Sequence, residues 1–100
     1  PANSKDAEYH RRLGTIYMLL GHLDRAESEF DLAIETYERQ LDSVSRPEGK
    51  AQLIWLIAQT LADQGDLEAA LEKAKQAEAM STSAKLNWKI SLWRSGLVMK

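Results

Sequence analysis

Apolar residues recur along this 100-residue chain at the spacing of a helix rather than that of a strand. Side chains three and four positions apart lie on the same face of an α-helix, whereas strands alternate apolar and polar residues. No alternating run occurs, and β-branched residues are few. The most regular segment predicts a helix with one buried stripe, formed by Ala26, Phe30, Ala33, Tyr37, Leu41 and Val44.

The segment before this stripe predicts another helix. It begins at a capping residue, Asn3 or Ser4, and extends to about Leu20. The pair Gly21-His22 interrupts the apolar pattern. Asp24 is then the expected N-cap of the second helix.

A third predicted helix differs from the others because it is apolar on nearly every side. Residues 51–62 read AQLIWLIAQTLA. A helix without a polar face must pack between neighbours, so we expect this one at the centre of the fold. Pro47 suits the first turn of this helix better than the interior of the previous one.

Two more helices complete the pattern. A turn at residues 64–66 leads into a fourth helix, and Ser81-Thr82-Ser83 offers caps for a fifth that extends to about residue 100. Five helices joined by short connections predict an all-α fold, arranged as an antiparallel helical array. The expected buried stripe of the fourth helix is Leu67, Ala70, Leu71, Ala74, Ala77 and Met80.

Two of the connections share one sequence pattern. Residues 21–26 (GHLDRA) and 65–70 (GDLEAA) both read Gly-x-Leu-acid-x-Ala and lie 44 positions apart. Further residues stand at fixed spacing around the first connection. They are His10, Leu13, Gly14 and Tyr17 before it, and Ala26, Phe30 and Ala33 after it.

This arrangement resembles the tetratricopeptide repeat (TPR), a helical hairpin with the pattern Trp-x2-Leu-Gly-x2-Tyr, then Ala-x3-Phe, then Pro. In such a hairpin Gly14 lets the two helices pack closely, and Tyr17 and Phe30 fill the space between them. The second unit keeps the pattern more loosely and lacks the aromatic residues. The resemblance implies one domain over residues 1–100, a TPR-like α-solenoid. It would contain repeat 1 at about 7–46, repeat 2 at about 47–82 and a C-terminal half-repeat helix at about 83–100.

Two residues depart from the family pattern. His10 stands where the family prefers Trp, and Glu38 stands where it has Pro. Without that proline the second helix continues through Leu41 and Val44, about ten residues beyond the ~34-residue family repeat. The chain is therefore similar to the long-repeat variety of kinesin light chains and bacterial signalling regulators.

The last predicted helix, LNWKISLWRSGLVMK, has two apolar stripes instead of one. A helix that ends an array should have one apolar face and one polar face exposed to solvent. The second stripe therefore needs a cover, either further repeats of a longer chain or another molecule. We expect Trp88 to be buried. The first stripe is Leu86, Ile90, Trp93 and Leu97; the second is Trp88, Leu92 and Met99.

The charge distribution separates this helix from the rest of the chain. Residues 85–100 contain four basic and no acidic residues, whereas residues 1–84 carry a net charge of −6. The total of −2 disfavours broad nucleic-acid binding. No apolar run approaches the ~18 residues of a membrane span, the first residues are too polar for a signal peptide, and cysteine is absent. We expect a cytoplasmic protein.

Nothing in the sequence supports an enzyme, a cofactor or a metal site. His10 and His22 are the only histidines, and no grouping of nucleophile and acid surrounds them. A glycine-rich phosphate loop, a His-Glu-x-x-His pattern and a Gly-x-Ser-x-Gly elbow are all absent. Acidic pairs such as Glu27/Glu29 are typical of solvated helix faces.

The family resemblance implies a binding site for a protein or peptide. In this family the first helix of each repeat lines a concave face, where a peptide or helix of the partner lies. Trp55 and Trp93 would be the anchors, with Arg11 and Lys89 as charged selectors; alternatively, both tryptophans are core residues. The predicted partner-binding residues are Arg11, Thr15, Trp55, Gln59, Lys89 and Trp93, and Met18 or Leu19, Gln52 and Asp63 also fall on this face.

Other interpretations follow from the last helix and from the groove. Self-association would pair the stripe of Trp88, Leu92 and Met99 across a two-fold axis, giving a homodimer. Binding of acidic chaperone tails is disfavoured, because Thr15 and Gln59 stand where the family's carboxylate clamp has Asn. A membrane-surface or calmodulin-target helix is disfavoured, because the second apolar stripe separates the basic edge from the polar one. The leading hypothesis is an interaction module of a larger regulator or scaffold.

Overall fold

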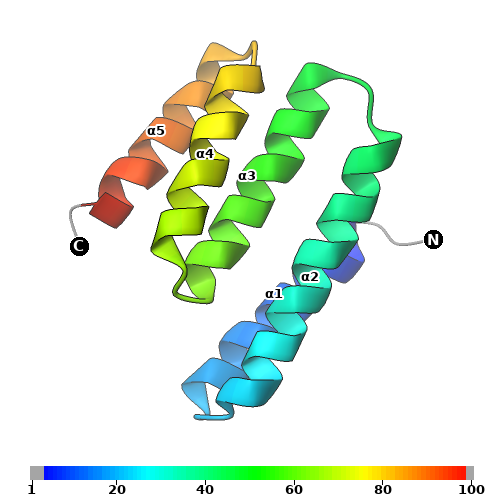
Figure 1. Cartoon of the computed structure of the whole chain (residues 1–100), viewed down its shortest axis with the longest axis vertical. Helices are drawn as coiled ribbons and strands as arrows, with labels where there is room; N and C mark the ends of the chain where they lie inside the picture. Colours follow the sequence, from blue (N-terminus) through cyan, green and yellow to red (C-terminus); the bar gives the residue numbers. More distant parts are fainter. Residues whose placement is uncertain (1–3, 99–100) are drawn as a thin grey trace.

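The computed structural model describes residues 4–98, which form five α-helices joined by short connections (Figure 1). No strand occurs in this part of the chain, so the prediction of an all-α helical array is confirmed. The helices are α1 (Ser4–Leu19), α2 (Leu23–Ser43), α3 (Pro47–Asp63), α4 (Leu67–Met80) and α5 (Ala84–Val98). Consecutive helices run in opposite directions, and the α1–α2 and α3–α4 hairpins are the best-packed pairs of the array.

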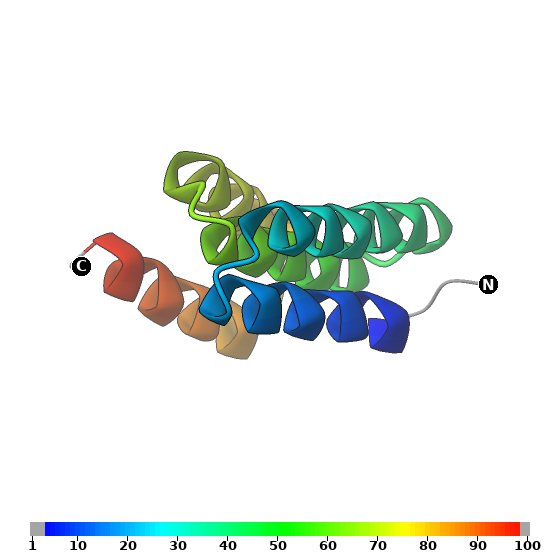
Figure 2. The ribbon, with the colours of Figure 1, turned by 90° about the horizontal axis from the view of Figure 1, so that it is seen from below.

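The array is a slab only two helices thick, with extents of 39 × 38 × 17 Å. Seen from below, α1 and α5 lie on one side of the slab and α2 and α4 on the other (Figure 2). α3 lies in the middle of the array, while α5 and the α1–α2 hairpin form its two opposite edges (Figures 1 and 2).

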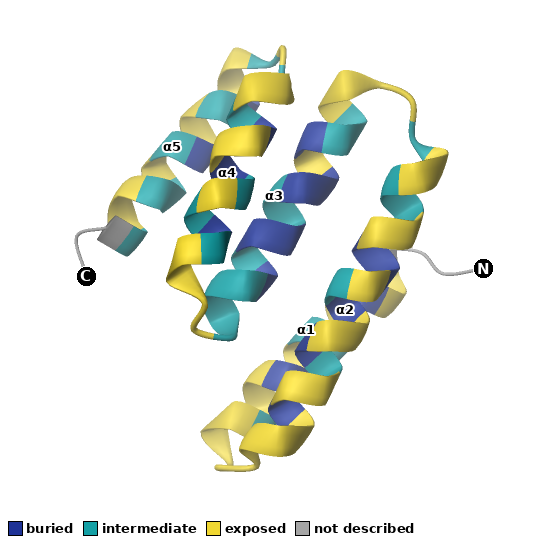
Figure 3. Cartoon of the chain, in the orientation of Figure 1, coloured by how far each residue is buried: buried dark blue, intermediate teal, exposed yellow. Residues whose placement is uncertain are grey.

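α3 is buried on two sides, as its sequence predicts, and Figure 3 shows buried residues along most of its length. One apolar cluster lies between α3, α4 and α5, and a second lies between α3, α2 and the start of α1. α3 therefore joins the two halves of the array. The first cluster contains Ala51, Ile54, Ala58, Ala74, Ala77, Leu86 and Ile90; the second contains Ala7, Tyr37, Leu53 and Ile57.

The two connections with a shared sequence pattern also share a backbone structure. Gly21 and Gly65 have positive φ angles of 82° and 93°, in the left-handed region that favours glycine. The Gly21 N–H donates to the Met18 carbonyl, and the next N–H donates to the Tyr17 carbonyl. The same two bonds link residues 65 and 66 to residues 62 and 61. Both hairpins therefore turn through the same glycine-based C-terminal cap.

The start of α2 differs from the prediction. α2 begins at Leu23, so His22 occupies the N-cap position without a capping side-chain bond, and Asp24 lies inside the first turn. Because the chain after the glycine turn is helical from Leu23 onward, Asp24 already lies inside the helix and cannot be its N-cap. Its carboxylate still complements the positive end of the helix. In the second turn an aspartate does cap: Asp66 accepts a bond from the Ala69 N–H.

The predicted starts of the third and fifth helices are confirmed, whereas Asn3, one of the two candidate caps of the first helix, lies outside the described residues. Pro47 is in the first turn of α3, where its missing N–H costs no helical bond. Ser83 precedes α5, and its Oγ accepts a hydrogen bond from the Leu86 N–H at 3.2 Å.

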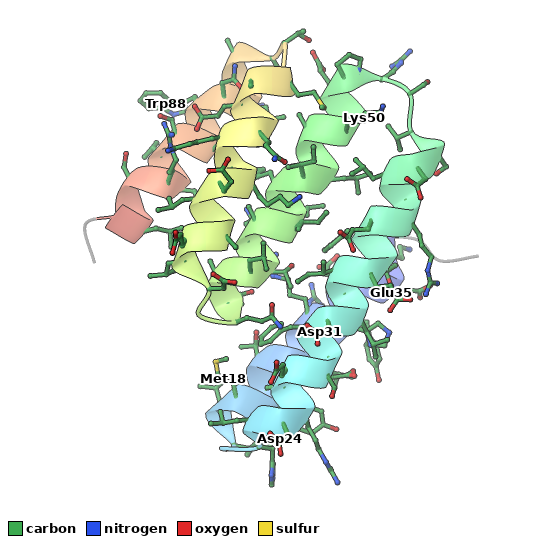
Figure 4. The ribbon with its side chains drawn as sticks, viewed as in Figure 1. Met18, Asp24, Asp31, Glu35, Lys50 and Trp88 are labelled. Atoms are coloured by element: carbon green, nitrogen blue, oxygen red, sulfur yellow. The ribbon has the colours of Figure 1, made fainter. Side chains whose placement is uncertain are left out.

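α5 uses only one of its two apolar stripes for packing. Leu86 and Ile90 are buried and Trp93 packs beside them, whereas Trp88 and Leu92 are 68% and 53% exposed. Trp88 points away from the array at its edge (Figure 4). The prediction that Trp88 is buried is therefore wrong, because α4 covers α5 on the opposite side only. Met99, the third member of the second stripe, lies outside the described residues.

Gly14 marks the closest approach of α1 and α2. A Cβ atom built at this position would lie 2.7 Å from two ring atoms of Phe30, which is buried. Gly96 provides a matched comparison in α5, because a Cβ there would have no neighbour within 4 Å. Glycine is thus required sterically at residue 14 but not at residue 96.

We expect opposite effects of alanine at these two positions on the free energy of unfolding in urea. Gly96→Ala should stabilise the protein by up to about 1 kcal/mol, the helix-propensity gain. Gly14→Ala has the same gain, but overpacking against Phe30 costs about 1–3 kcal/mol, so a net loss is expected. Equal stabilisation by both variants would contradict the close crossing.

Candidate functional site

The face formed by α1, α3 and α5 has a shallow hollow on either side of α3. One hollow, of about 230 Å³, lies between α1 and α3, and the other, of about 240 Å³, lies between α3 and α5. Mostly polar side chains surround both, which suits a face that contacts water or a polar ligand. The lining residues are Glu8, Arg11, Arg12, Thr15 and Asp63 in the first hollow, and Glu48, Gln52, Ser83, Lys85, Leu86 and Lys89 in the second.

Arg11, predicted as a charged selector, bonds to α3. Its Nε donates to Asp63 Oδ2 at 2.7 Å, and its Nη1 donates to Gln59 Oε1 at 3.1 Å. The structure therefore brings together the predicted site residues Arg11 and Gln59. The guanidinium is engaged within the chain, where it joins the first hairpin to the second.

Tyr37 of α2 completes this junction, which the sequence did not reveal because Tyr37 fits the apolar stripe. Its ring is buried in the cluster between α2 and α3, and its hydroxyl lies near the Arg11 guanidinium. Burial raises the pKa of Tyr37 above its ordinary value of 10.0, although the nearby positive charge of Arg11 opposes that rise. One arginine thus contacts side chains of both α2 and α3.

Trp55 and Trp93, the predicted anchors, are each half-buried against the same apolar cluster. The indole Nε1 of Trp55 is buried without a hydrogen-bond partner in the described part of the chain. A buried, unpaired N–H lowers stability. Both rings therefore belong to the core on one side and remain partly accessible on the other.

Thr15 and Lys89 are the exposed members of the predicted site. Thr15 lines the hollow beside α1, where its hydroxyl donates to the Arg11 carbonyl. Lys89 lines the hollow beside α5 with Lys85, and neither ammonium forms an ion pair within residues 4–98. By contrast, Arg94 on the other side of α5 pairs with Glu78 of α4 at 3.2 Å. The uncompensated positive charge of α5 is thus on the α1–α3–α5 face.

A third hollow, of about 380 Å³, lies between the two glycine turns and was not anticipated from the sequence. Met18, which the family pattern placed in the groove, lines this hollow instead. The hollow arises where the ends of the two hairpins meet, which depends on their packing and not on any local motif. Its lining residues are Met18, Leu23, Ala26, Glu27, Phe30, Gln64 and Asp66.

Among residues 4–98, no three His, Asp or Glu side chains gather closely enough to hold a metal ion. His10 faces Glu29, with 3.0 Å between Nδ1 and Oε1. Within the same residues, no helix has the length and apolarity needed to cross a membrane.

Comparison with known proteins yields no match to a protein-family model, to a curated protein or to a solved structure. The resemblance to the TPR family therefore depends on the residues of the two hairpins alone.

The Arg11–Asp63 pair should couple the two hairpins energetically. Both side chains are partly buried, so a double-mutant cycle of Arg11→Ala and Asp63→Ala should give a coupling of about 1 kcal/mol in unfolding free energy. Arg12→Ala and Glu8→Ala, an exposed pair within α1, form the control cycle, expected at about 0.3–0.5 kcal/mol. Additive effects of the first pair would show that it does not hold the hairpins together.

Tyr37 should make the protein sensitive to alkali. Because its pKa is raised in the folded state, the unfolded chain loses this proton first as pH rises, and stability falls above about pH 10. Tyr37→Phe should reduce this fall, measured as the urea midpoint from pH 8 to pH 11, and the exposed Tyr9→Phe should not. An identical alkaline fall in the Tyr37→Phe variant would contradict the assignment.

Proposed function

We propose that this chain is a protein-interaction module that binds a peptide or helix of a partner on the face formed by α1, α3 and α5. The observation that carries the proposal is the convergence of residues from three helices on one accessible face. Half-buried Trp55 and Trp93 pack against the core of α3, α4 and α5, and Lys89 and Thr15 are exposed beside the two hollows of this face. Rigid aromatic side chains beside adaptable polar ones are typical of protein-binding surfaces.

The resemblance of the two hairpins to the TPR pattern supports the same proposal. Two hairpins with the same glycine turn stand side by side, and the first helix of each lies toward one face. In the family that this pattern resembles, that face receives the partner. The chain would then act as part of a larger regulator or scaffold, in the cytoplasm.

Self-association through α5 is the second candidate function. The exposure of Trp88 and Leu92 favours it, because large exposed apolar side chains next to each other on a helix are typical of interaction surfaces. This surface lies on the outer side of α5 and is separate from the α1–α3–α5 face.

The first proposal can be tested with peptides selected from a random displayed library on the wild-type chain. Their Kd values would then be measured by fluorescence polarisation on Lys89→Glu and Thr15→Arg. The matched control is Lys75→Glu, a charge reversal at an exposed residue of α4. Substitutions on the binding face should weaken binding at least tenfold, about 1.4 kcal/mol, because each places a wrong charge or bulk in the groove. The control should leave Kd within about twofold.

Two outcomes would contradict the proposal. Selection would yield no binding peptide, or the selected peptides would bind Lys89→Glu and Thr15→Arg as tightly as the wild type. Circular dichroism of each variant should match the wild type, since all three substituted residues are exposed.

A further inference from the structure

The hollow between the two glycine turns has an apolar lining. Ala26 and Phe30 of α2 are its buried members, and Met18 and Leu23 are exposed beside them. Met18 lies between the end of α1 and the α3–α4 turn (Figure 4). The volume of about 380 Å³ falls within the range of about 300–1,000 Å³ that is usual for ligand sites. Apolar surface is therefore available to a group that enters this hollow.

Two carboxylates with free oxygen atoms line the same hollow. Glu27 forms no hydrogen bond or ion pair within residues 4–98. Asp66 accepts the capping bond from the Ala69 N–H through Oδ1, which leaves Oδ2 free. The third polar side chain of the lining, Gln64, donates from Nε2 to Asp31 Oδ1 at 2.9 Å. No Lys, Arg or His of the described chain lines the hollow, so its lining residues carry a net charge of −2.

Neighbouring groups do not offset this negative charge. Arg25, the basic residue closest in sequence to Glu27, lies over the Tyr17 ring and lines a different hollow. Lys73 of α4 is seven residues beyond Asp66, roughly 10 Å along the helix. The C-terminal ends of α1 and α3 and the N-terminal ends of α2 and α4 lie at this end of the array, so their opposite dipoles offset one another (Figure 1). Glu27 and Asp66 therefore make the hollow favourable for a cation.

A group that fits this hollow joins a positive charge to an apolar stem. Ionised carboxylates accept hydrogen bonds and cannot donate them, so the group beside them must be a donor. Arginine combines several N–H donors with an apolar stem, and its guanidinium is more weakly hydrated than the ammonium of lysine. An arginine side chain thus suits both the apolar and the acidic parts of the lining.

The exposed leucines around the hollow favour a partner polypeptide over a free small cation. Leu19, Leu20 and Leu67 are at the two glycine turns, and Leu23 is in the lining of the hollow itself. Their side chains are between 45% and 82% exposed. Apolar residues next to an arginine in a partner chain can cover these leucines, whereas a small cation cannot.

We propose that the hollow between the glycine turns is a second binding site, which takes an arginine side chain from a partner segment with apolar residues beside that arginine. Glu27 and Asp66 pair with the guanidinium, and Met18 and Leu23 contact its stem. None of the lining residues belongs to the two hollows of the α1–α3–α5 face. The inference therefore does not rest on peptide binding at that face.

The test compares three short peptides that differ only in the central residue. They are acetyl-Leu-Arg-Leu-amide and its analogues with citrulline, which has the shape of arginine without the charge, and with glutamate. In an NMR titration of the isotope-labelled wild-type chain, the arginine peptide should shift the amide signals of Leu23, Glu27 and Asp66. The citrulline peptide should bind about tenfold more weakly, because it loses two ion pairs, and the glutamate peptide should not bind.

Substitutions that remove the carboxylates and keep the fold provide the second measurement. Asp66→Asn preserves the helix cap, because asparagine caps as well as aspartate, and Glu27→Gln changes an exposed residue. Each should weaken binding of the arginine peptide about threefold, the effect of one exposed ion pair, and the double variant about tenfold. Glu72→Gln is the matched control, an exposed carboxylate of α4 outside the hollow, and should leave Kd within about twofold.

Three results would overturn the proposal. The arginine peptide would fail to bind or would bind no more tightly than the citrulline peptide. The double variant would bind the arginine peptide as tightly as the wild type. Acetyl-arginine-amide would bind as tightly as the full peptide, which would assign the hollow to a small organic cation instead of a partner segment.

Lys89→Glu distinguishes this site from the α1–α3–α5 face. The variant should weaken the peptides selected for that face and leave the affinity of the arginine peptide unchanged, because Lys89 does not line the hollow between the glycine turns. Weakening of the arginine peptide by Lys89→Glu, without an effect of Glu27→Gln, would move its binding to the α1–α3–α5 face and contradict the second site.

Discussion

The burial of α3 on two sides is the constraint on which the rest of the structure depends. Its Leu53 and Ile57 pack toward the first hairpin, and its Ile54 and Ala58 pack toward α4 and α5. Because apolar burial is the main favourable term in folding, a helix that is apolar all round is stable only between two neighbours. Each hairpin supplies one of those neighbours, so α3 holds together two halves that would otherwise have little contact.

Polar contacts then fix how the two halves meet. Arg11 reaches from α1 to Gln59 and Asp63 of α3 and to Tyr37 of α2, at the border of the α1–α3–α5 face. The same side chain thus contributes to the lining of a hollow and to the angle between the hairpins. A partner that bound beside Thr15 would contact a surface whose shape depends on this junction.

Within residues 4–98, α5 is packed on one side only, and this explains the two kinds of surface in the proposals. α1 and α3 each have a partner helix that covers their apolar residues, and the side chains left toward the common face are polar or half-buried. α5 packs on α4 through Leu86 and Ile90 and leaves Trp88 and Leu92 in solvent. At the other end of the slab, α1 leaves Tyr9 and Ile16 exposed. The α1–α3–α5 face and the exposed Trp88/Leu92 surface of α5 are therefore different parts of the molecule.

The sequence by itself determined the five helices, the two glycine turns and most of the buried stripe of α2, because helical spacing and glycine turns are local properties of the chain. In α4 the prediction was partly wrong: Ala70, Ala74 and Ala77 are buried, whereas Leu67 and Met80 at the two ends of the helix are 45% and 38% exposed. Only the tertiary structure decided which stripe of α5 is buried, since Leu86/Ile90 and Trp88/Leu92 are equally apolar and the choice depends on where α4 lies. The tertiary structure also decided the contacts of Arg11. Its spacing placed it on the predicted binding face, but Asp63 and Tyr37, which it contacts, are distant from it in sequence. The structure likewise decided the start of α2, where the geometry of the glycine turn excluded Asp24 from the cap. Local chemistry therefore specified the elements, whereas long-range packing determined which side chains remain free to bind a partner.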